Sequence, residues 1–262
     1  MSPTTASALA VFFYCLSAFL IFKQLGTEQH QRWVALLPAV LAMLLQAVAM
    51  NEIIILSQGL NLGFFAAFSL IGWLISIQII LSSIYRRIES LGIVVFPISG
   101  CAGMVASLHF ADHLIVISDS EIKGHIMVSV IAYSLITLGA FQAALLAYQD
   151  HSIRQHHPGG FIRHLPPLHD METLLFQFLG FGFICLSASL LTGFIYLEDI
   201  FAQHLVHKTV LSIVGWVILG VLLFGRLRFG WRGKTAIRWT LSAFAFLMLA
   251  FFGSKLVLEF IL

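Results

Sequence analysis

Histidine and carboxylate side chains gather at one set of ends of the long apolar stretches that make up this chain. Five of its eleven histidines and six carboxylates belong to this outer group. Its members are Glu52, His109, Asp112, His113, Asp119, Glu121, His125, Glu198, Asp199, His204 and His207. Imidazole and carboxylate groups ligate iron and divalent cations, and they also carry protons. The outer group therefore predicts a site for heme iron, for a divalent metal or for proton transfer.

His125 is the first candidate ligand, because two hydroxyl residues follow it at helical spacing. Ser129 and Tyr133 stand at i+4 and i+8, so the three side chains share one stripe of a helix. Such a histidine can direct its imidazole into a pocket at the membrane surface, and neutral imidazole is an axial ligand of heme iron. The alternative is an interfacial histidine that hydrogen-bonds only the neighbouring loop.

His109 and His113 form a second candidate pair. They are four residues apart, which suits a two-histidine metal site if the helix continues that far. No third ligand stands near them in the sequence. The candidate metal ligands are therefore His125, His109 and His113.

His204 and His207 precede a predicted span and are three residues apart. They are either further cofactor ligands or a loop pair that faces water. Carboxylates near a ligating histidine orient its ring. The candidates for that role are Asp199, Glu198 and Glu52.

Membrane-spanning helices must position all of these residues. The chain has 262 residues, 60% hydrophobic and 10% charged, whereas soluble domains carry about 25% charged residues. A helix needs roughly 20 apolar residues to cross the hydrocarbon core, and long apolar runs in lipid are helical because each backbone polar group must be satisfied internally. The pattern predicts an all-α transmembrane bundle of about eight spans, at residues 6–22, 33–56, 62–84, 91–110, 125–148, 172–196, 207–225 and 237–258.

The basic residues predict the orientation of the bundle. Eleven follow the first, third, fifth and seventh spans, and only Lys123, Lys208 and Lys255 lie on the other side. Since Lys and Arg accumulate in cytoplasmic loops, both termini and the outer group should lie outside. We expect one integral membrane domain over residues 1–262, located in the cell inner membrane. Its partner is the lipid bilayer. The orientation of the bundle already explains where the basic residues lie, so they give no reason to expect nucleic acid binding.

No motif for nucleotide binding, hydrolysis or phosphoryl transfer occurs in the chain. Cys15, Cys101 and Cys185 fall inside spans and form no C-x-x-C, which indicates small buried side chains and no redox site. We therefore expect that the protein is not an enzyme.

Two connections on the predicted inner side are distinctive. The connection at residues 149–171 contains prolines and glycines, which predict irregular backbone, and its histidines match no standard metal site. Gly230-Trp231-Arg232-Gly233-Lys234 suits a turn anchored at the inner headgroups, either as a structural turn or as a docking point for a partner. An anchoring role alone does not explain why two glycines bracket the tryptophan.

Several of these segments together carry a family resemblance. They are Lys208–Trp216 (KTVLSIVGW), Gly230–Gly233 (GWRG), Phe252–Lys255 (FGSK), the His125, Ser129 and Tyr133 stripe, Leu165–Leu168 (LPPL) followed by Met171-Glu172, and Asn61-Leu62. In these segments, and over essentially its whole length, the chain resembles the cytochrome c assembly protein family, the CcsA/HemX group. It looks most similar to the short YpjD-type inner-membrane branch of that group.

The resemblance implies a helix bundle that binds or moves heme, or that assists cytochrome c maturation, with a cytochrome or another membrane protein as partner. In the large members, two outer histidines flank a tryptophan-rich outer loop, and His125 matches the first of them. This chain has no tryptophan between Tyr196 and Trp216, so stacking on a heme face would fall to Tyr196 and Phe201.

Other departures concern the remaining ligands. No histidine follows His207, and Gln46 and Arg226 stand where related proteins carry histidines within the membrane. His125 therefore either ligates alone or takes a partner from among His204, His207, His109 and His113.

Two functions from different classes follow. The first is a heme-binding or heme-handling membrane protein, with heme ligated at the outer, periplasmic face by His125. The second is a heme-free accessory or transport protein that keeps the fold and uses the outer group for divalent cations or a partner protein. A continuous polar path across the membrane would favour the second, and its candidates are Gln46, Gln78 and Gln142.

Overall fold

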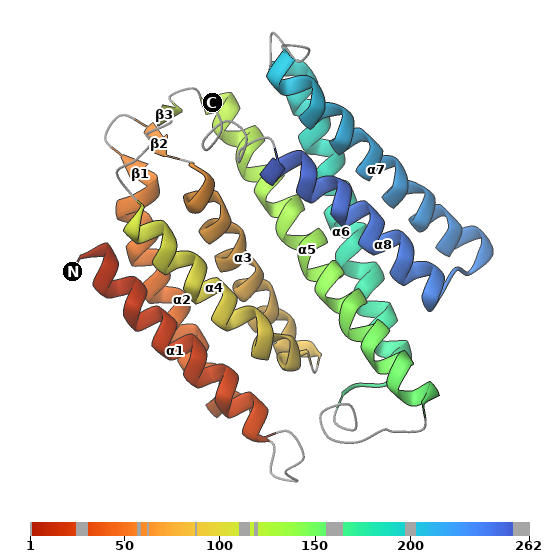
Figure 1. Ribbon diagram of the computed structural model, residues 1–262, viewed down its shortest axis with the longest axis horizontal. Helices are drawn as coiled ribbons and strands as arrows, with labels where there is room; N and C mark the ends of the chain where they lie inside the picture. Colours follow the sequence, from red (N-terminus) through yellow and green to blue (C-terminus); the bar gives the residue numbers. More distant parts are fainter. Residues whose placement is uncertain are drawn as a thin grey trace. The chain divides into compact units, whose positions relative to one another are not determined.

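The computed structural model describes residues 2–24, 31–56, 59–61, 63–86, 88–109, 116–117, 120–155, 165–196 and 203–253. Eight α-helices account for most of these residues (Figure 1). They are α1 (Pro3–Gln24), α2 (Arg32–Ile54), α3 (Phe64–Tyr85), α4 (Gly92–Leu108), α5 (Ser120–Arg154), α6 (Leu168–Tyr196), α7 (Gln203–Phe229) and α8 (Lys234–Met248). A 3₁₀ turn η1 (Glu89–Leu91) precedes α4, and a π-helical turn η3 (Leu249–Gly253) continues α8. Each of the eight segments is long and apolar enough to cross a membrane, which confirms the predicted all-α bundle of eight spans.

The helices on either side of the 149–171 connection are longer than predicted. α5 continues to Arg154, and α6 begins at Leu168, so helix replaces part of the expected irregular backbone at both ends. The Arg154 Nε lies 3.0 Å from the Asp150 carboxylate. An ion pair at i, i+4 favours helix, which helps the last turn of α5 to persist beyond the apolar span.

Three very short strands were not predicted. They are β1 (Ile55–Leu56), β2 (Gly59–Asn61) and β3 (Val116–Ile117), and they pair antiparallel in the order β1-β2-β3. Leu60 of β2 is opposite Ile55 on one side and Ile117 on the other. The strands join the end of α2 to the segment that follows α4, and they leave the fold class unchanged.

The chain divides into two compact units. The first comprises Met1–Ser118 with Gly159–Pro166, and the second comprises Asp119–Pro158 with Pro167–Leu262. α1 to α4 belong to the first unit and α5 to α8 to the second. A single domain over residues 1–262 stays a prediction.

Gln46 ties together the four helices of the first unit. It is fully buried on α2, where its Oε1 accepts a hydrogen bond of 3.0 Å from the Tyr14 hydroxyl of α1. Its Nε2 donates to Ser69 Oγ of α3 at 3.2 Å and to the Ser99 carbonyl of α4 at 3.2 Å. A Cβ on Gly103 would come within 3.1 Å of Nε2, so a small residue is needed there. Gln46 is therefore a structural cross-link between helices, of the kind that buried amides form in membranes.

In the second unit, α5 and α6 pack most extensively, as an antiparallel pair. A Cβ on Gly139 of α5 would lie 2.9 Å from Leu179, and one on Gly182 of α6 would lie 2.8 Å from Ile136. Small residues let helix backbones approach closely in a membrane. Gln142 Nε2 also donates to the Met171 carbonyl across this pair, at 3.2 Å.

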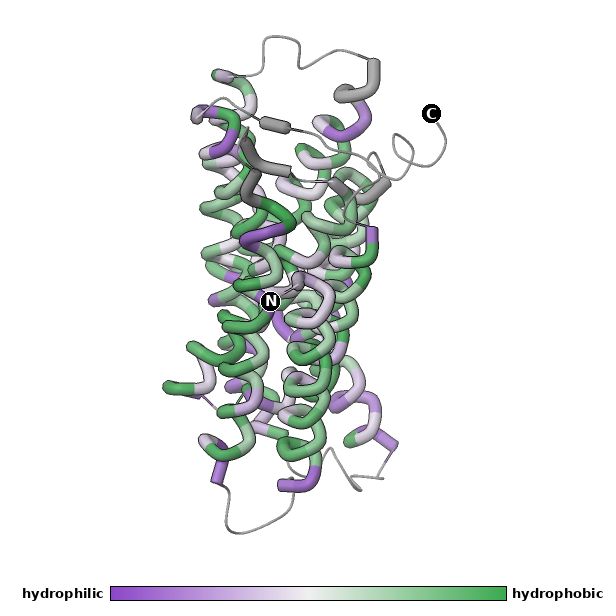
Figure 2. Tube along the Cα trace, turned by 90° about the vertical axis from the view of Figure 1, so that its left-hand side faces the viewer, coloured by the Kyte–Doolittle hydropathy of each residue, from purple (hydrophilic) through white to green (hydrophobic). Residues whose placement is uncertain are grey.

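The outer surfaces of both units suit lipid. Apolar residues predominate along the helices, and polar residues concentrate toward their ends (Figure 2). Large side chains such as Leu37, Phe181 and Phe224 are more than half exposed, which is expected where the solvent is hydrocarbon. Cys15 and Cys101 are also exposed. The prediction that they are buried was wrong, because a thiol is apolar enough to face lipid.

Candidate functional site

A cavity of about 260 Å³ lies within the second unit, lined by α5, α6, α7 and the η3 residue Phe251. Most of its wall surface is apolar, as is usual for a small-molecule site, although half of the lining residues also carry a polar group. The side chains with polar groups are His125, Ser129, Tyr133, Ser189, Tyr196, Lys208, Thr209 and Ser212.

The imidazole of His125 is held on α6 through Thr192. The Thr192 hydroxyl is 2.9 Å from the Ala188 carbonyl and 3.0 Å from the Ser189 carbonyl, so its single hydrogen is donated to the backbone of its own helix. Thr192 Oγ1 lies 3.0 Å from His125 Nδ1 and must therefore accept the hydrogen bond. This network assigns the hydrogen of the neutral imidazole to Nδ1 and the lone pair to Nε2. In that form, Nε2 can ligate a metal.

Ser129 and Tyr133 line the same cavity below His125, as their helical spacing predicted. Ser129 Oγ donates to the His125 carbonyl at 2.7 Å and lies 2.7 Å from Ser189 Oγ. The Tyr133 hydroxyl pairs with Ser212 of α7, and its ring lies 4.9 Å from the Phe251 ring. The stripe is therefore fastened to α6, α7 and η3, and it holds one wall of the cavity in place.

Lys208 is a cavity residue that the sequence did not single out as functional. It is partly buried on α7, and its ammonium lies 5.7 Å from the centre of the Phe251 ring. It is also within electrostatic range of His125. The signal in the sequence was its rarity, since Lys208 is one of only three basic residues on the predicted outer side.

Of the other predicted cofactor residues, only some line the cavity. Tyr196 lines the cavity, but His207 is exposed on α7 and is not among the lining residues. The side chain of His204 and all of Phe201 lie outside the described residues, as do Glu198 and Asp199. The structure thus brings His125, Ser129, Tyr133 and Tyr196 together.

Of the predicted metal pair, only His109 is among the described residues, so the pair stays a prediction. His109 ends α4, where its Nδ1 lies 3.1 Å from the Val105 carbonyl and its ring lies 4.7 Å from the Phe65 ring. His113 lies outside the described residues. Glu52 is exposed on α2 of the first unit. Across the described ranges, no group of three His, Cys, Asp or Glu side chains is placed to hold a metal ion.

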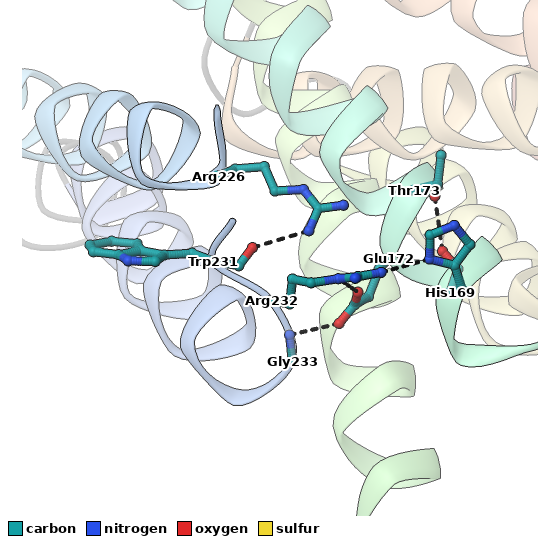
Figure 3. A network of polar contacts seen from close by, with 7 residues as sticks. All are labelled: His169, Glu172, Thr173, Arg226, Trp231, Arg232 and Gly233. Carbon is teal, nitrogen blue, oxygen red and sulfur yellow. Dashed lines mark hydrogen bonds and ion pairs between the residues drawn. The ribbon is translucent and has the colours of Figure 1, made fainter. Parts of the chain in front are cut away.

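The Gly230–Gly233 turn forms a second polar network, at the start of α6 (Figure 3). Glu172 of α6 is buried, and its Oε1 accepts a hydrogen bond of 2.6 Å from the Gly233 backbone N–H. Its Oε2 lies 3.2 Å from Arg232 Nε, and Arg232 Nη2 donates to His169 Nδ1 at 2.7 Å. We call these four residues the α6–α8 clasp. Sequence reasoning missed Glu172 as the centre of the clasp.

The two glycines of the turn are explained by its backbone. Gly230 has φ +67° and Gly233 has φ +54° with ψ −127°, a region that side chains strongly disfavour. Trp231 packs against Gly225 of α7, where a Cβ would collide with the indole, and stacks near Trp239 at 5.4 Å. Arg226 donates to the Trp231 carbonyl at 3.3 Å and lies over the Phe176 ring. Arg226, like Gln46, therefore has a structural role.

The fold defines a multi-pass membrane protein with a cavity in its second unit. The family model described as "Cytochrome C assembly protein" matches residues 33–262, so the chain belongs to the cytochrome c assembly protein family. It is 28% identical to the inner membrane protein YpjD of Escherichia coli K12, over 97% of both chains. It is also 36% identical to an uncharacterised 28.8 kDa protein of Azospirillum brasilense, over 53% of this chain and 52% of that protein. No solved structure matches the chain.

Proposed function

We propose that this protein binds and hands over heme in the inner membrane, with His125 as the axial ligand in the cavity of the second unit. The single observation that supports this most is the state of the His125 imidazole, which lines an apolar cavity with Nδ1 bonded to Thr192. Membership of the cytochrome c assembly family gives the heme chemistry its context. The Escherichia coli relative is named as an inner membrane protein, which agrees with the eight apolar helices of this chain.

The side chains that line the cavity are of the kinds that hold a heme. Ligating histidines almost always donate their second ring nitrogen to a neighbouring acceptor, and Thr192 is that acceptor for His125. The apolar walls suit a macrocycle, and Tyr133 and Tyr196 add aromatic surface. When bound, heme supplies an iron that accepts the Nε2 lone pair.

The chain itself would bind, orient and release this cargo without transforming it. Thr192 and the Ser129–Ser189 pair keep the ring in one orientation, and the closely packed α5–α6 pair holds the wall that carries it. The hydroxyl that contacts the His125 imidazole, Thr192 Oγ1, accepts a hydrogen bond from it and is not activated as a nucleophile, so we propose a binding role and no enzyme activity. The positive-inside bias supports a periplasmic position for the His125 end of α5.

The heme-free transport alternative has less support. A transport path would need polar side chains that face an open route, but Gln46 and Gln142 hydrogen-bond neighbouring helices within their units. A site for divalent cations would need clustered ligands, and the described part of the chain shows no such cluster. A role that depends on a partner protein is compatible with heme handover.

The test is an absorbance spectrum of the purified protein in detergent, oxidised and reduced, after expression with a heme precursor. We expect a Soret band in the wild type and its loss in His125→Ala, because the ligating nitrogen is removed. His109→Ala is the matched control, since His109 lies in the first unit and does not line the cavity. Equal bands in all three proteins would overturn the ligand assignment. No band in the wild type, even after added hemin, would overturn heme binding.

A further inference from the structure

The cavity of the second unit contains a positive charge that the proposed iron ligation does not use. Lys208 projects from the first turns of α7 and lines the same cavity as His125 of α5. Most of the surrounding lining is apolar, including Leu186, Leu190 and Phe194. An ammonium inside a membrane protein is costly unless an anion or water compensates it.

The described residues provide Lys208 with no such anion. No carboxylate among them lies within ion-pair distance of its ammonium; the Asp150 and Glu172 carboxylates pair with Arg154 and Arg232 instead. The Lys208 ammonium lies over the face of the Phe251 ring, 5.7 Å from the ring centre. Such a contact partly stabilises a cation but does not neutralise it.

Hydroxyl groups beside Lys208 add hydrogen-bonding capacity on the same wall. Thr209 lines the cavity next to it, and Ser212 follows one turn later on the same face of α7. The imidazole of His125 stands on the wall formed by α5 and α6. An occupant would therefore meet a metal-ligating nitrogen on one wall, a cation with hydroxyls on another, and apolar side chains between them.

We propose that Lys208 is a specificity-determining residue that binds an ionised carboxylate of the ligand. The cavity then selects a flat, apolar tetrapyrrole that carries free carboxylates, over its esterified form. This inference rests on the proposed function, because it takes the class of ligand from there. It does not depend on the contact between His125 and iron. The carboxylate contact requires no metal, so the two ideas can fail separately.

The experiment compares three probes on purified protein in detergent: hemin, hemin dimethyl ester and metal-free protoporphyrin IX. Binding is followed by the absorbance of the probes and by quenching of tryptophan fluorescence. The proteins are the wild type, Lys208→Met, Lys208→Arg and His125→Ala. Lys123→Met is the matched control, because Lys123 lies near His125 on α5 without lining the cavity.

We expect Lys208→Met to weaken the binding of hemin and of protoporphyrin IX by about tenfold or more, the range for losing a hydrogen bond to a charged group. The dimethyl ester should bind the wild type and Lys208→Met equally weakly. Lys208→Arg should retain the preference for free carboxylates. This result would show that the position tolerates substitution, so that weak binding by Lys208→Met reflects the lost charge. Lys123→Met should bind all three probes like the wild type.

Other outcomes separate the two ideas. If the wild type binds protoporphyrin IX in a Lys208-dependent way but shows no ligation of hemin iron, the proposed axial ligand fails and the carboxylate contact stands. If Lys208→Met binds hemin as tightly as the wild type, or if the ester binds as well as the free acid, the inference is wrong. If added phosphatidylglycerol abolishes the difference between Lys208→Met and the wild type, the cation belongs to a lipid phosphate and the inference is again wrong.

Discussion

At the residue scale, the chemistry of the site depends on how one imidazole is oriented. His125 would be an ordinary interfacial histidine without Thr192, whose hydroxyl hydrogen is committed to the carbonyls of its own helix. That commitment makes Thr192 an acceptor and leaves the lone pair of the imidazole on Nε2. A residue one helix away thus determines which imidazole nitrogen is available as the proposed iron ligand.

Replacing Thr192 by valine should test this role. Valine keeps the shape of threonine but removes the acceptor, so we expect heme affinity to fall by about tenfold or more, as for other partners of ligating histidines. Thr192→Ser should retain the wild-type affinity and Soret position. Hemin titrations of the three proteins measure the effect. Equal affinities for the valine variant and the wild type would show that Thr192 does not orient the ligand.

At the scale of elements, the second unit is organised by helix pairs. Gly139 and Gly182 bring α5 and α6 close enough for the His125–Thr192 and Ser129–Ser189 contacts to form. At the other end of α6, the α6–α8 clasp joins Glu172 to the turn before α8. The glycines of that turn have backbone angles that side chains disfavour, which explains the sequence Gly230–Gly233 structurally.

Glu172→Ala should destabilise the protein without lowering its affinity for hemin. It removes the acceptor of the Gly233 N–H and the partner of Arg232, which is itself half exposed. We expect a loss of about 1–3 kcal/mol in the free energy of unfolding, observed as a lower thermal midpoint in detergent. Glu172→Gln should lose less, because its amide oxygen can still accept from Gly233. A fall in hemin affinity without a fall in stability would contradict a purely structural clasp.

At the scale of the whole molecule, the eight apolar helices favour insertion into a membrane, and the unequal distribution of basic residues between its two sides favours one orientation. Eleven of the fourteen Lys and Arg residues lie either in the connections after α1, α3, α5 and α7 or in the helix ends that flank them. Both termini and the His125 end of α5 are therefore expected outside. This orientation would let a periplasmic partner reach the cavity.

Reporter fusions test the orientation directly. Alkaline phosphatase is active only after export, so a fusion after Leu262 should be active and a fusion after Gln155, in the connection between α5 and α6, should be inactive. The physical reason is retention of the basic connections on the cytoplasmic side. The opposite pair of activities would show the reverse orientation, with the cavity end of α5 in the cytoplasm.

The eight spans and the stripe of His125, Ser129 and Tyr133 were predictable from the order of residues alone. Both depend on local properties, because apolar length and helical spacing are set within one segment. The segments that carry the family resemblance were equally visible, and the family was confirmed.

Only the tertiary structure decided which residues from different helices meet. Nothing in the spacing indicated that Thr192 would hold His125, that Lys208 and not His207 would face the cavity, or that Glu172 would accept from Gly233. Gln46 could have been a path residue or a cross-link until its partners on three other helices were known. These pairings depend on the register and rotation of packed helices, which arise from side-chain interlocking along their whole length and not from the pattern of any one helix.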